Sequence, residues 1–290
     1  MSQVPTSQTT VRLTRIEFEL TQSQFQRIRE LVRTHTGIAL SDHKFQLVHG
    51  RLARRLRALK LDNFGDYIKL LESGVGPEIE EFTNAVTTNL TSFFREPHHF
   101  EHMAREMLPA LVANSSAHRR LRIWCCAAST GEEPYSIAMV LREAERELAG
   151  WDAKILATDL DSAVLAAGAA GIYAAARFDN MDSRRISRFF EKGAGAQAGH
   201  FRAREELRNL ITFKQLNLMS PWPMRGPFDA IFCRNVIIYF DKPTQRALFE
   251  RMAKLQRPGD LLFLGHSETL YRVSSRYELV GRTIYRRLED

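Results

Sequence analysis

The sequence is poor in cysteine and lacks a long apolar run. Its 290 residues include three cysteines, Cys125, Cys126 and Cys233, which form no CxxC pair and no disulfide-like framework. This usage fits a reducing compartment, and we interpret all three as small core residues beside strands. The longest apolar stretches, such as NVIIYF, are far too short to span a bilayer. We therefore expect a cytoplasmic protein with no direct membrane insertion.

The N-terminal segment also lacks a targeting signal. MSQVPTSQTTVRLTRIEFEL is polar and has no apolar core of the kind that signal peptides carry. With 44% hydrophobic residues, a chain of this length can bury a sizeable core, and we expect two domains.

Acidic residues are outnumbered, and much of the basic excess lies in one stretch. The net charge is +7, which indicates either an acidic partner or a solvated basic surface. In SDHKFQLVHGRLARRLRALK, residues 41–60, Ser41 is a predicted helix N-cap and apolar residues recur at helical spacing. The predicted helix buries one side and presents the other to a docking partner or to solvent. The residues that we assign to substrate binding on it are Arg51, Arg54, Arg55 and Arg57.

Helical patterns fill the first third of the chain. Thr21 is a predicted N-cap of a helix that ends at Gly37, NFGDYIKLLESG is a second helix, and PEIEEFTNAVTTNLTSFFRE has apolar residues at helical spacing. We predict an all-helical N-terminal domain over residues 18–90.

From about residue 120 the pattern changes to that of an α/β domain. LRIWCC, KILATDLD, FDAIFCRNV and DLLFLG are short apolar runs separated by helical stretches, which is typical of a mostly parallel sheet covered by helices. Ligands of such sheets bind beyond the carboxyl ends of the strands, where the strand order reverses. The loop AASTGEEPYS after the first run and Asp159 at the end of the second both belong at that edge.

The loop lacks the GxGxxG pattern that holds a dinucleotide pyrophosphate. It carries Glu132 and Glu133 instead, and two carboxylates repel a pyrophosphate. A nucleoside with a sulfonium and an ammonium group, such as S-adenosylmethionine, is compatible with them. We interpret Glu133 as a ligand to a cationic cofactor, Glu132 as a solvent-exposed glutamate in a first helical turn, and Asp159 as the acceptor for the ribose hydroxyls.

Five stretches together resemble the CheR-type chemotaxis receptor methyltransferases: TTNLTSFFREPHHF, AASTGEEPYSIAM, ATDLD, FDAIFCRNVIIYFD and RPGDLLFLGHSE. The resemblance runs in the family's order from about Leu20 to Tyr285. It implies a Rossmann-like methyltransferase domain, over residues 95–290, with a small inserted β-subdomain at about 175–210. It also implies S-adenosyl-L-methionine as cofactor, with S-adenosyl-L-homocysteine as product, and methylation of glutamate carboxylates on the cytoplasmic helices of chemoreceptors.

The chemistry of methyl transfer and the resemblance together assign roles to individual residues. Arg95 and Tyr239 are the catalytic candidates, because a carboxylate acceptor needs orientation and no general base. The inserted subdomain resembles those that bind a peptide at the receptor's C-terminal tail, and we expect a monomer. The implied cofactor-binding residues are Asn89, Thr91, Arg95, Glu133, Asp159, Asn217, Leu218, Asn235 and Val236.

Other functions have weaker support in the sequence. A nucleic-acid methyltransferase suits the basic charge, but RNVIIYF lacks the paired prolines of the adenine amino-methyltransferase motif. A non-catalytic, receptor-binding adaptor is disfavoured by the intact motifs. His98, His99 and His102 with Glu101 have no second ligand cluster, so we expect no metal site. GHSE at 265–268 is not a GxSxG nucleophile elbow.

Overall fold

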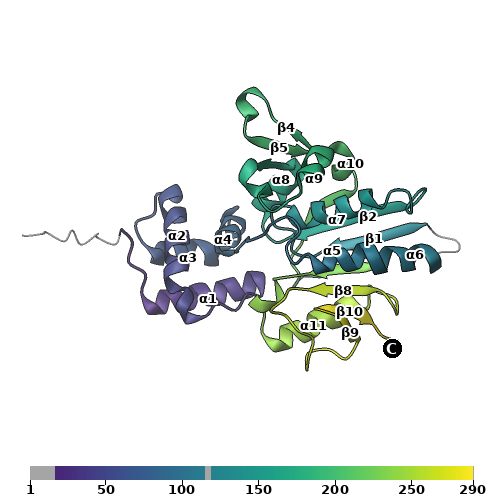
Figure 1. Ribbon diagram of the computed structural model, residues 1–290. Helices are drawn as coiled ribbons and strands as arrows, with labels where there is room; N and C mark the ends of the chain where they lie inside the picture. Colours follow the sequence, from purple (N-terminus) through teal and green to yellow (C-terminus); the bar gives the residue numbers. More distant parts are fainter. Residues whose placement is uncertain (1–16, 115–118, 290) are drawn as a thin grey trace, which may run out of the picture.

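The chain forms a helical N-terminal domain beside a larger α/β domain (Figure 1). The computed structural model describes residues 17–114 and 119–289, so the polar segment 1–16 considered above lies outside the described residues. The first domain consists of α1 (Gln22–Thr36), α2 (Phe45–Leu59), α3 (Phe64–Ser73) and α4 (Glu78–Val86). Within the described ranges, no helix is both long and apolar enough to cross a bilayer.

The ends of the first helices test the capping predictions. Thr21 accepts from the backbone N–H of Gln24 and caps α1, and Gly37 ends this helix in a left-handed conformation, so both predictions are confirmed. The prediction for Ser41 is wrong. It precedes a short 3-10 turn without a side-chain hydrogen bond, and α2 begins only at Phe45. Helix α4 also stops at Val86, because the chain leaves the helical domain there and becomes extended.

The core of the helical domain is formed by one side of each helix. Phe25, Leu52 and Phe82 are fully buried in it. The predicted apolar stripe of α2 faces this core, with Val48 and Leu56 buried. Ile38, just after α1, packs against this core and also against a core of the α/β domain, so it joins the two domains.

Seven described strands form one sheet in the order β6–β2–β1–β7–β8–β10–β9. The first five in this order run parallel, and β10 and β9 add an antiparallel edge. The strand order reverses between β1 and β7, which makes the switch point at which α/β sheets bind ligands. The bounds are β1 (Arg120–Cys125), β2 (Asp152–Asp159), β6 (Ile211–Gln215), β7 (Ala230–Cys233), β8 (Leu261–Leu264), β9 (Tyr277–Gly281) and β10 (Ile284–Arg287).

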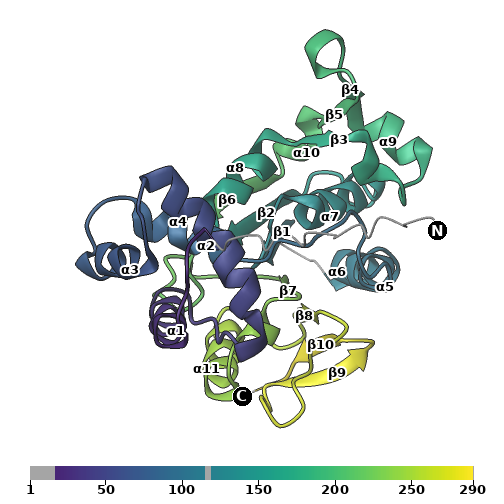
Figure 2. The same cartoon turned by 90° about the vertical axis from the view of Figure 1, so that its left-hand side faces the viewer.

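Helices cover both faces of this sheet (Figures 1 and 2). Side chains alternate between the faces of a strand. Ile123 therefore packs in the same core as α5 and α7, whereas Trp124 packs in the core that contains α11. The helices of this domain outside the insertion are α5 (His98–His102), α6 (Leu108–Asn114), α7 (Glu132–Glu143), α8 (Ser162–Ala170) and α11 (Lys242–Ala253).

A small subdomain is inserted between α8 and β6, at the top of Figure 1. Its strands β3, β5 and β4 form an antiparallel sheet, with β5 in the centre. The expected range of about 175–210 omits β3, a three-residue strand that periodicity could not reveal. The elements are β3 (Ile172–Ala174), α9 (Ser183–Phe189), β4 (Phe190–Lys192), β5 (His200–Ala203) and α10 (Glu205–Arg208).

Candidate functional site

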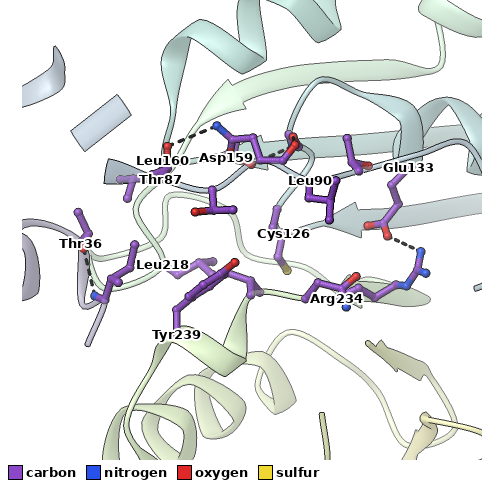
Figure 3. A pocket seen from close by; sticks show the side chains of 18 of the residues that line it. Thr36, Thr87, Leu90, Cys126, Glu133, Asp159, Leu160, Leu218, Arg234 and Tyr239 are labelled. Atoms are coloured by element: carbon purple, nitrogen blue, oxygen red, sulfur yellow. Dashed lines mark hydrogen bonds and ion pairs between the residues drawn. The ribbon is translucent and has the colours of Figure 1, made fainter. Parts of the chain in front are cut away.

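A pocket lies between the two domains, beyond the carboxyl ends of β1, β2 and β7 (Figure 3). It encloses about 910 Å³ of space, part of which is open solvent. The helical domain contributes Thr36 and Ile38 to its wall. The structure brings all the predicted cofactor-binding residues and Tyr239 to this one pocket: Asn89, Thr91, Arg95, Glu133, Asp159, Asn217, Leu218, Asn235 and Val236.

Asp159 ends β2 and lies at the pocket wall with both carboxylate oxygens oriented by the backbone. The N–H of Ser129 donates to Oδ2 at 2.8 Å, and the N–H of Asp161 donates to Oδ1 at 3.0 Å. Burial raises the pKa of Asp159, and these backbone hydrogen bonds oppose the rise. Each carboxylate oxygen has a further lone pair, so Asp159 can still accept from two vicinal hydroxyl groups.

The extended segment between the domains is fastened to Asp161. Asn89 Nδ2 and Thr87 Oγ1 each donate to Asp161 Oδ2 at 2.8 Å. The other oxygen, Oδ1, accepts from Ala163 N at 2.9 Å and so caps α8. One carboxylate therefore holds the interdomain segment, with Asn89 on it, against the methyltransferase sheet.

Asn217 is at the pocket wall, but its side chain is already engaged. Its Nδ2 donates to the carbonyl of His35 at 2.7 Å, and its Oδ1 accepts from Met219 N at 2.9 Å. The amide thus joins the α/β domain to the end of α1. Leu218 beside it is buried and supplies apolar wall.

Arg234, which the sequence prediction missed, is a buried residue that lines the pocket and contacts Glu133, Glu96 and the backbone of Arg95. Its side chain is only 1% exposed, and its Nη1 lies 2.5 Å from Glu133 Oε2. Its Nη2 donates to the carbonyl of Arg95 and lies 3.4 Å from Glu96 Oε2. Cys125 Sγ donates to the other oxygen of Glu133. The negative charge of Glu133 is therefore compensated inside the protein, as the dashed line in Figure 3 marks.

Glu132 does not face solvent, so the interpretation of an exposed first-turn glutamate is wrong. Its side chain is fully buried, forms an ion pair with Arg177 of the inserted subdomain, and accepts from Thr130 Oγ1 at 2.6 Å. Arg177 also donates to the carbonyl of Thr91 at 2.9 Å. The insertion thus contacts both the loop after β1 and the interdomain segment.

Gly131, the glycine of this loop, serves packing and does not line the pocket. Its φ is +97°, and a Cβ there would lie 2.8 Å from Tyr173 Oη and 3.0 Å from Gly168 Cα. A side chain would push α7 away from α8 and the insertion. Ala127 and Ser129, earlier in the same loop, do line the pocket.

Arg95 and Tyr239 both line this pocket. Arg95 Nη1 donates to the carbonyl of Leu90 at 2.8 Å, and in the described part of the chain its guanidinium has no carboxylate partner. Tyr239 ends the short turn Ile237–Tyr239 after β7, and its carbonyl accepts from Ala39 N of the helical domain at 2.8 Å. Arg95 can therefore offer a free positive charge to an anionic acceptor.

The arginines of α2 differ in how free they are. Arg51 donates to the carbonyls of Val86 and Thr87, Arg55 pairs with two glutamates of α4, and Arg57 pairs with Glu17. Arg54 is exposed and has no hydrogen bond or ion pair with any described residue. Arg51, Arg54 and Arg55 line a shallow groove that reaches Thr87, a residue that also lines the cofactor pocket, whereas Arg57 lies outside it.

The histidine-rich segment gathers Glu96, His98 and His99, whose ligand atoms lie within 4.8 Å of one another. His102 pairs instead with Glu106. Burial and the Arg234 charge lower the pKa of His99 to about 3. The guanidinium of Arg234 lies against the carboxylate of Glu96, and a cation in that place opposes the binding of a metal ion.

The chemistry of the pocket suits a nucleoside cofactor without phosphate groups. The cations that line it are Arg95 and Arg234, and Arg234 is committed to Glu133. Asp159 can accept ribose hydroxyls, and apolar wall from Leu218, among other residues, can cover a base. A pyrophosphate would meet Glu133 and Asp159 with little cationic compensation.

Comparison with known proteins also indicates a methyltransferase that binds S-adenosylmethionine, and the matches cover nearly the whole chain. Residues 89–286 match the family described as "CheR methyltransferase, SAM binding domain", and residues 23–87 match "CheR methyltransferase, all-alpha domain". The chain is 48% identical to chemotaxis protein methyltransferase 2 of Pseudomonas aeruginosa, over 93% of this chain and 94% of that one. It is 43% identical to the chemotaxis protein methyltransferase of Escherichia coli, over 100% of this chain and 99% of that one. With its helical domain, its S-adenosylmethionine-binding domain and the pocket between them, the chain belongs to the CheR methyltransferase family.

Proposed function

We propose that this protein transfers the methyl group of S-adenosylmethionine to glutamate side-chain carboxylates of chemoreceptors. The observation that carries this proposal is the pocket between the domains, where a nucleoside site lies beside the guanidinium of Arg95, which has no carboxylate partner among the described residues. The names of the relatives, chemotaxis protein methyltransferases, support the receptor as substrate. A nucleic-acid substrate has no comparable support.

The proposed chemistry is an in-line displacement in which the acceptor carboxylate needs no general base. A glutamate has a reference pKa of about 4.3, so it is already an ionised nucleophile at neutral pH. The bound S-adenosylmethionine supplies a methyl group activated by its sulfonium. Arg95 orients the carboxylate as a charge partner, and Tyr239 donates a hydrogen bond to one of its oxygens. Positioning of this kind supplies up to several kcal/mol of rate acceleration.

The proposed cofactor contacts follow from the pocket wall. Asp159 accepts the ribose hydroxyls, and Asn89, Thr91 and Asn235 offer polar groups around the cofactor. Glu133 accepts a hydrogen bond from the ammonium group of S-adenosylmethionine while it remains paired with Arg234, which already balances its charge. Leu218 and Val236 pack on the base, together with the rest of the apolar wall.

The receptor helix is proposed to lie in the groove of α2 and to extend to the pocket at Thr87. Of the arginines there, Arg54 is the one that can form a new ion pair without losing an old one, so we assign the strongest electrostatic contact to it. Arg51 and Arg55 shape the groove while they hold α4 and the interdomain segment.

The inserted subdomain is proposed to bind a peptide at the receptor's C-terminal tail. Among the described strands, β3 and β4 pair only with β5, and each therefore leaves one edge open for an added strand. We also propose that the protein is a monomer that acts in the cytoplasm, where receptor glutamates are accessible and its free, buried cysteines stay reduced.

The test is incubation with methyl-labelled S-adenosylmethionine and membranes that contain chemoreceptors, followed by mild alkali. A carboxyl ester releases volatile labelled methanol, and label that stays in the protein after alkali would contradict the proposal. Arg54→Ala should slow the labelling at low salt, and the difference from wild type should shrink at high salt. Arg57→Ala is the matched control, because Arg57 lies outside the groove.

A further inference from the structure

The motif GHSE, residues 265–268, follows β8 and is not explained by the proposed chemistry. Its last residue, Glu268, is only 4% exposed and does not line the pocket. Each of its two carboxylate oxygens nevertheless accepts two backbone hydrogen bonds. Its Oε2 accepts from Asn235 N at 2.8 Å and Gly265 N at 2.6 Å, and its Oε1 accepts from Ile237 N at 2.9 Å and Ile238 N at 3.3 Å.

Three of these amides belong to the turn after β7 that forms one wall of the pocket. Asn235 has a φ of +56°, a left-handed conformation that asparagine adopts more readily than most other residues with a side chain. Successive backbone N–H groups that point to one side form an anion-binding concavity. Here the anion is part of the protein, and it accepts hydrogen bonds from three backbone N–H groups of the turn.

Gln245 and Gly265 also contact this turn. Gln245 of α11 donates to the carbonyls of Ile237 and Phe240. Gly265 fits against the turn because it has no side chain, since a Cβ there would lie 2.3 Å from Asn235 Nδ2. The turn is therefore held by the carboxylate of Glu268, by the side-chain amide of Gln245 and by close packing against Gly265.

We propose that Glu268 is a positioning residue that sets the turn from Asn235 to Tyr239 in its working geometry. Glu268 fixes the position of Asn235 and Val236, which line the cofactor pocket. It also fixes the position of Tyr239, whose hydroxyl contacts the acceptor carboxylate. The second half rests on the function proposed above for Tyr239, whereas the first half does not depend on catalysis.

The variant that tests this is Glu268→Gln, which keeps the shape but turns one acceptor into a donor that faces backbone N–H groups. Hydrogen exchange of the protein without cofactor should show about tenfold less protection at Asn235, Ile237 and Ile238, the effect of one lost hydrogen bond. Titration calorimetry should show at least about tenfold weaker binding of S-adenosylhomocysteine, on the same scale.

Asp229→Asn is the matched control. Asp229 is also a buried carboxylate, accepts from Arg122 N at 2.7 Å, and precedes the same strand, β7, at its opposite end. That end is roughly 15 Å from the turn, at about 3.3 Å per residue. This variant should lower the melting temperature while it leaves product affinity and protection of the turn at wild-type values.

A double-mutant cycle on kcat at saturating cofactor tests the link to Tyr239. If Glu268 acts through Tyr239, Glu268→Gln should lower kcat much less in a Tyr239→Phe background than in wild type. A kcat unchanged by Tyr239→Phe alone would remove the role of Tyr239, while exchange and product binding still decide the role of Glu268.

Unchanged product affinity and unchanged protection in folded Glu268→Gln overturn the proposal. If that variant does not fold, Glu268→Asp keeps the charge and shortens its reach by one methylene group. Wild-type affinity and protection in Glu268→Asp overturn the proposal equally.

Discussion

Replacing Arg234 with methionine should destabilise the protein more than any change to its surface ion pairs. The side chain is buried and neutralises Glu133 at 2.5 Å and Glu96 at 3.4 Å. Methionine fills a similar volume but leaves both carboxylates without this partner. Removal of one member of a buried ion pair costs about 3–5 kcal/mol, a large part of the roughly 5–15 kcal/mol by which domains are stable.

The assay is urea unfolding of wild type, Arg234→Met, Glu133→Gln and the double variant, with product binding measured in parallel. The double variant should recover stability relative to Arg234→Met, because it no longer buries an unpaired Glu133, with a coupling of at least about 1 kcal/mol. Arg57→Met, which breaks the exposed pair with Glu17, is the control and should change stability by at most about 1 kcal/mol. A loss below about 1 kcal/mol in Arg234→Met, with no coupling to Glu133, would refute the reasoning.

Three further predictions follow from the pocket and its surroundings. Asp159→Ala should weaken cofactor binding by roughly 1.5–3 kcal/mol, the scale of a charged hydrogen bond, and calorimetry that finds wild-type affinity in the folded variant would exclude its role at the ribose. Burial acts to raise the pKa of Glu96, but the hydrogen bond from His266 and the charge of Arg234 outweigh it and lower the pKa to about 2. Stability from this shift, on the order of 3 kcal/mol, is present above the unfolded pKa of about 4.5 and is lost as pH falls towards 2. The difference in unfolding free energy between wild type and Glu96→Gln should therefore shrink between pH 6 and pH 3, and a constant difference would contradict the pairing. Finally, the single-turnover rate should stay nearly flat from about pH 6 upward, because the acceptor is already ionised there; a step near pH 6.5 that a substitution at His98, His99 or His102 abolishes would indicate a general base.

Local patterns predicted the elements of this fold well. Thr21 and Gly37 mark the ends of α1, since capping depends on residues within one helical turn. The four short apolar runs of the second half form strands β1, β2, β7 and β8. Such runs can be recognised in the sequence because a buried strand is a short block of apolar residues. The order of strands along the chain also predicted the edge at which the pocket lies, because carboxyl ends of parallel strands meet on one side of a sheet.

Pairing across the fold was not predictable in the same way. Arg234 stands in a run of the sequence that periodicity identifies only as the end of a strand, and its partner Glu133 is 101 residues away. Helical spacing placed Arg51, Arg55 and Arg57 off the core stripe of α2, but it could not show that α4, the segment after it and Glu17 would engage them. Glu132 looked exposed for the same reason, because Arg177 reaches it from an insertion that starts some 40 residues later.

The contact of Arg177 has a thermodynamic consequence for any ligand of the inserted subdomain. Arg177 holds Glu132, at the start of α7, and the carbonyl of Thr91, on the segment that borders the cofactor pocket. If this contact differs between the cofactor-bound and the cofactor-free protein, a peptide that changes its free energy also changes the affinity of the pocket for its cofactor. Reciprocity then requires the cofactor to change the affinity for the peptide by the same factor, so the two binding events cannot be tuned separately.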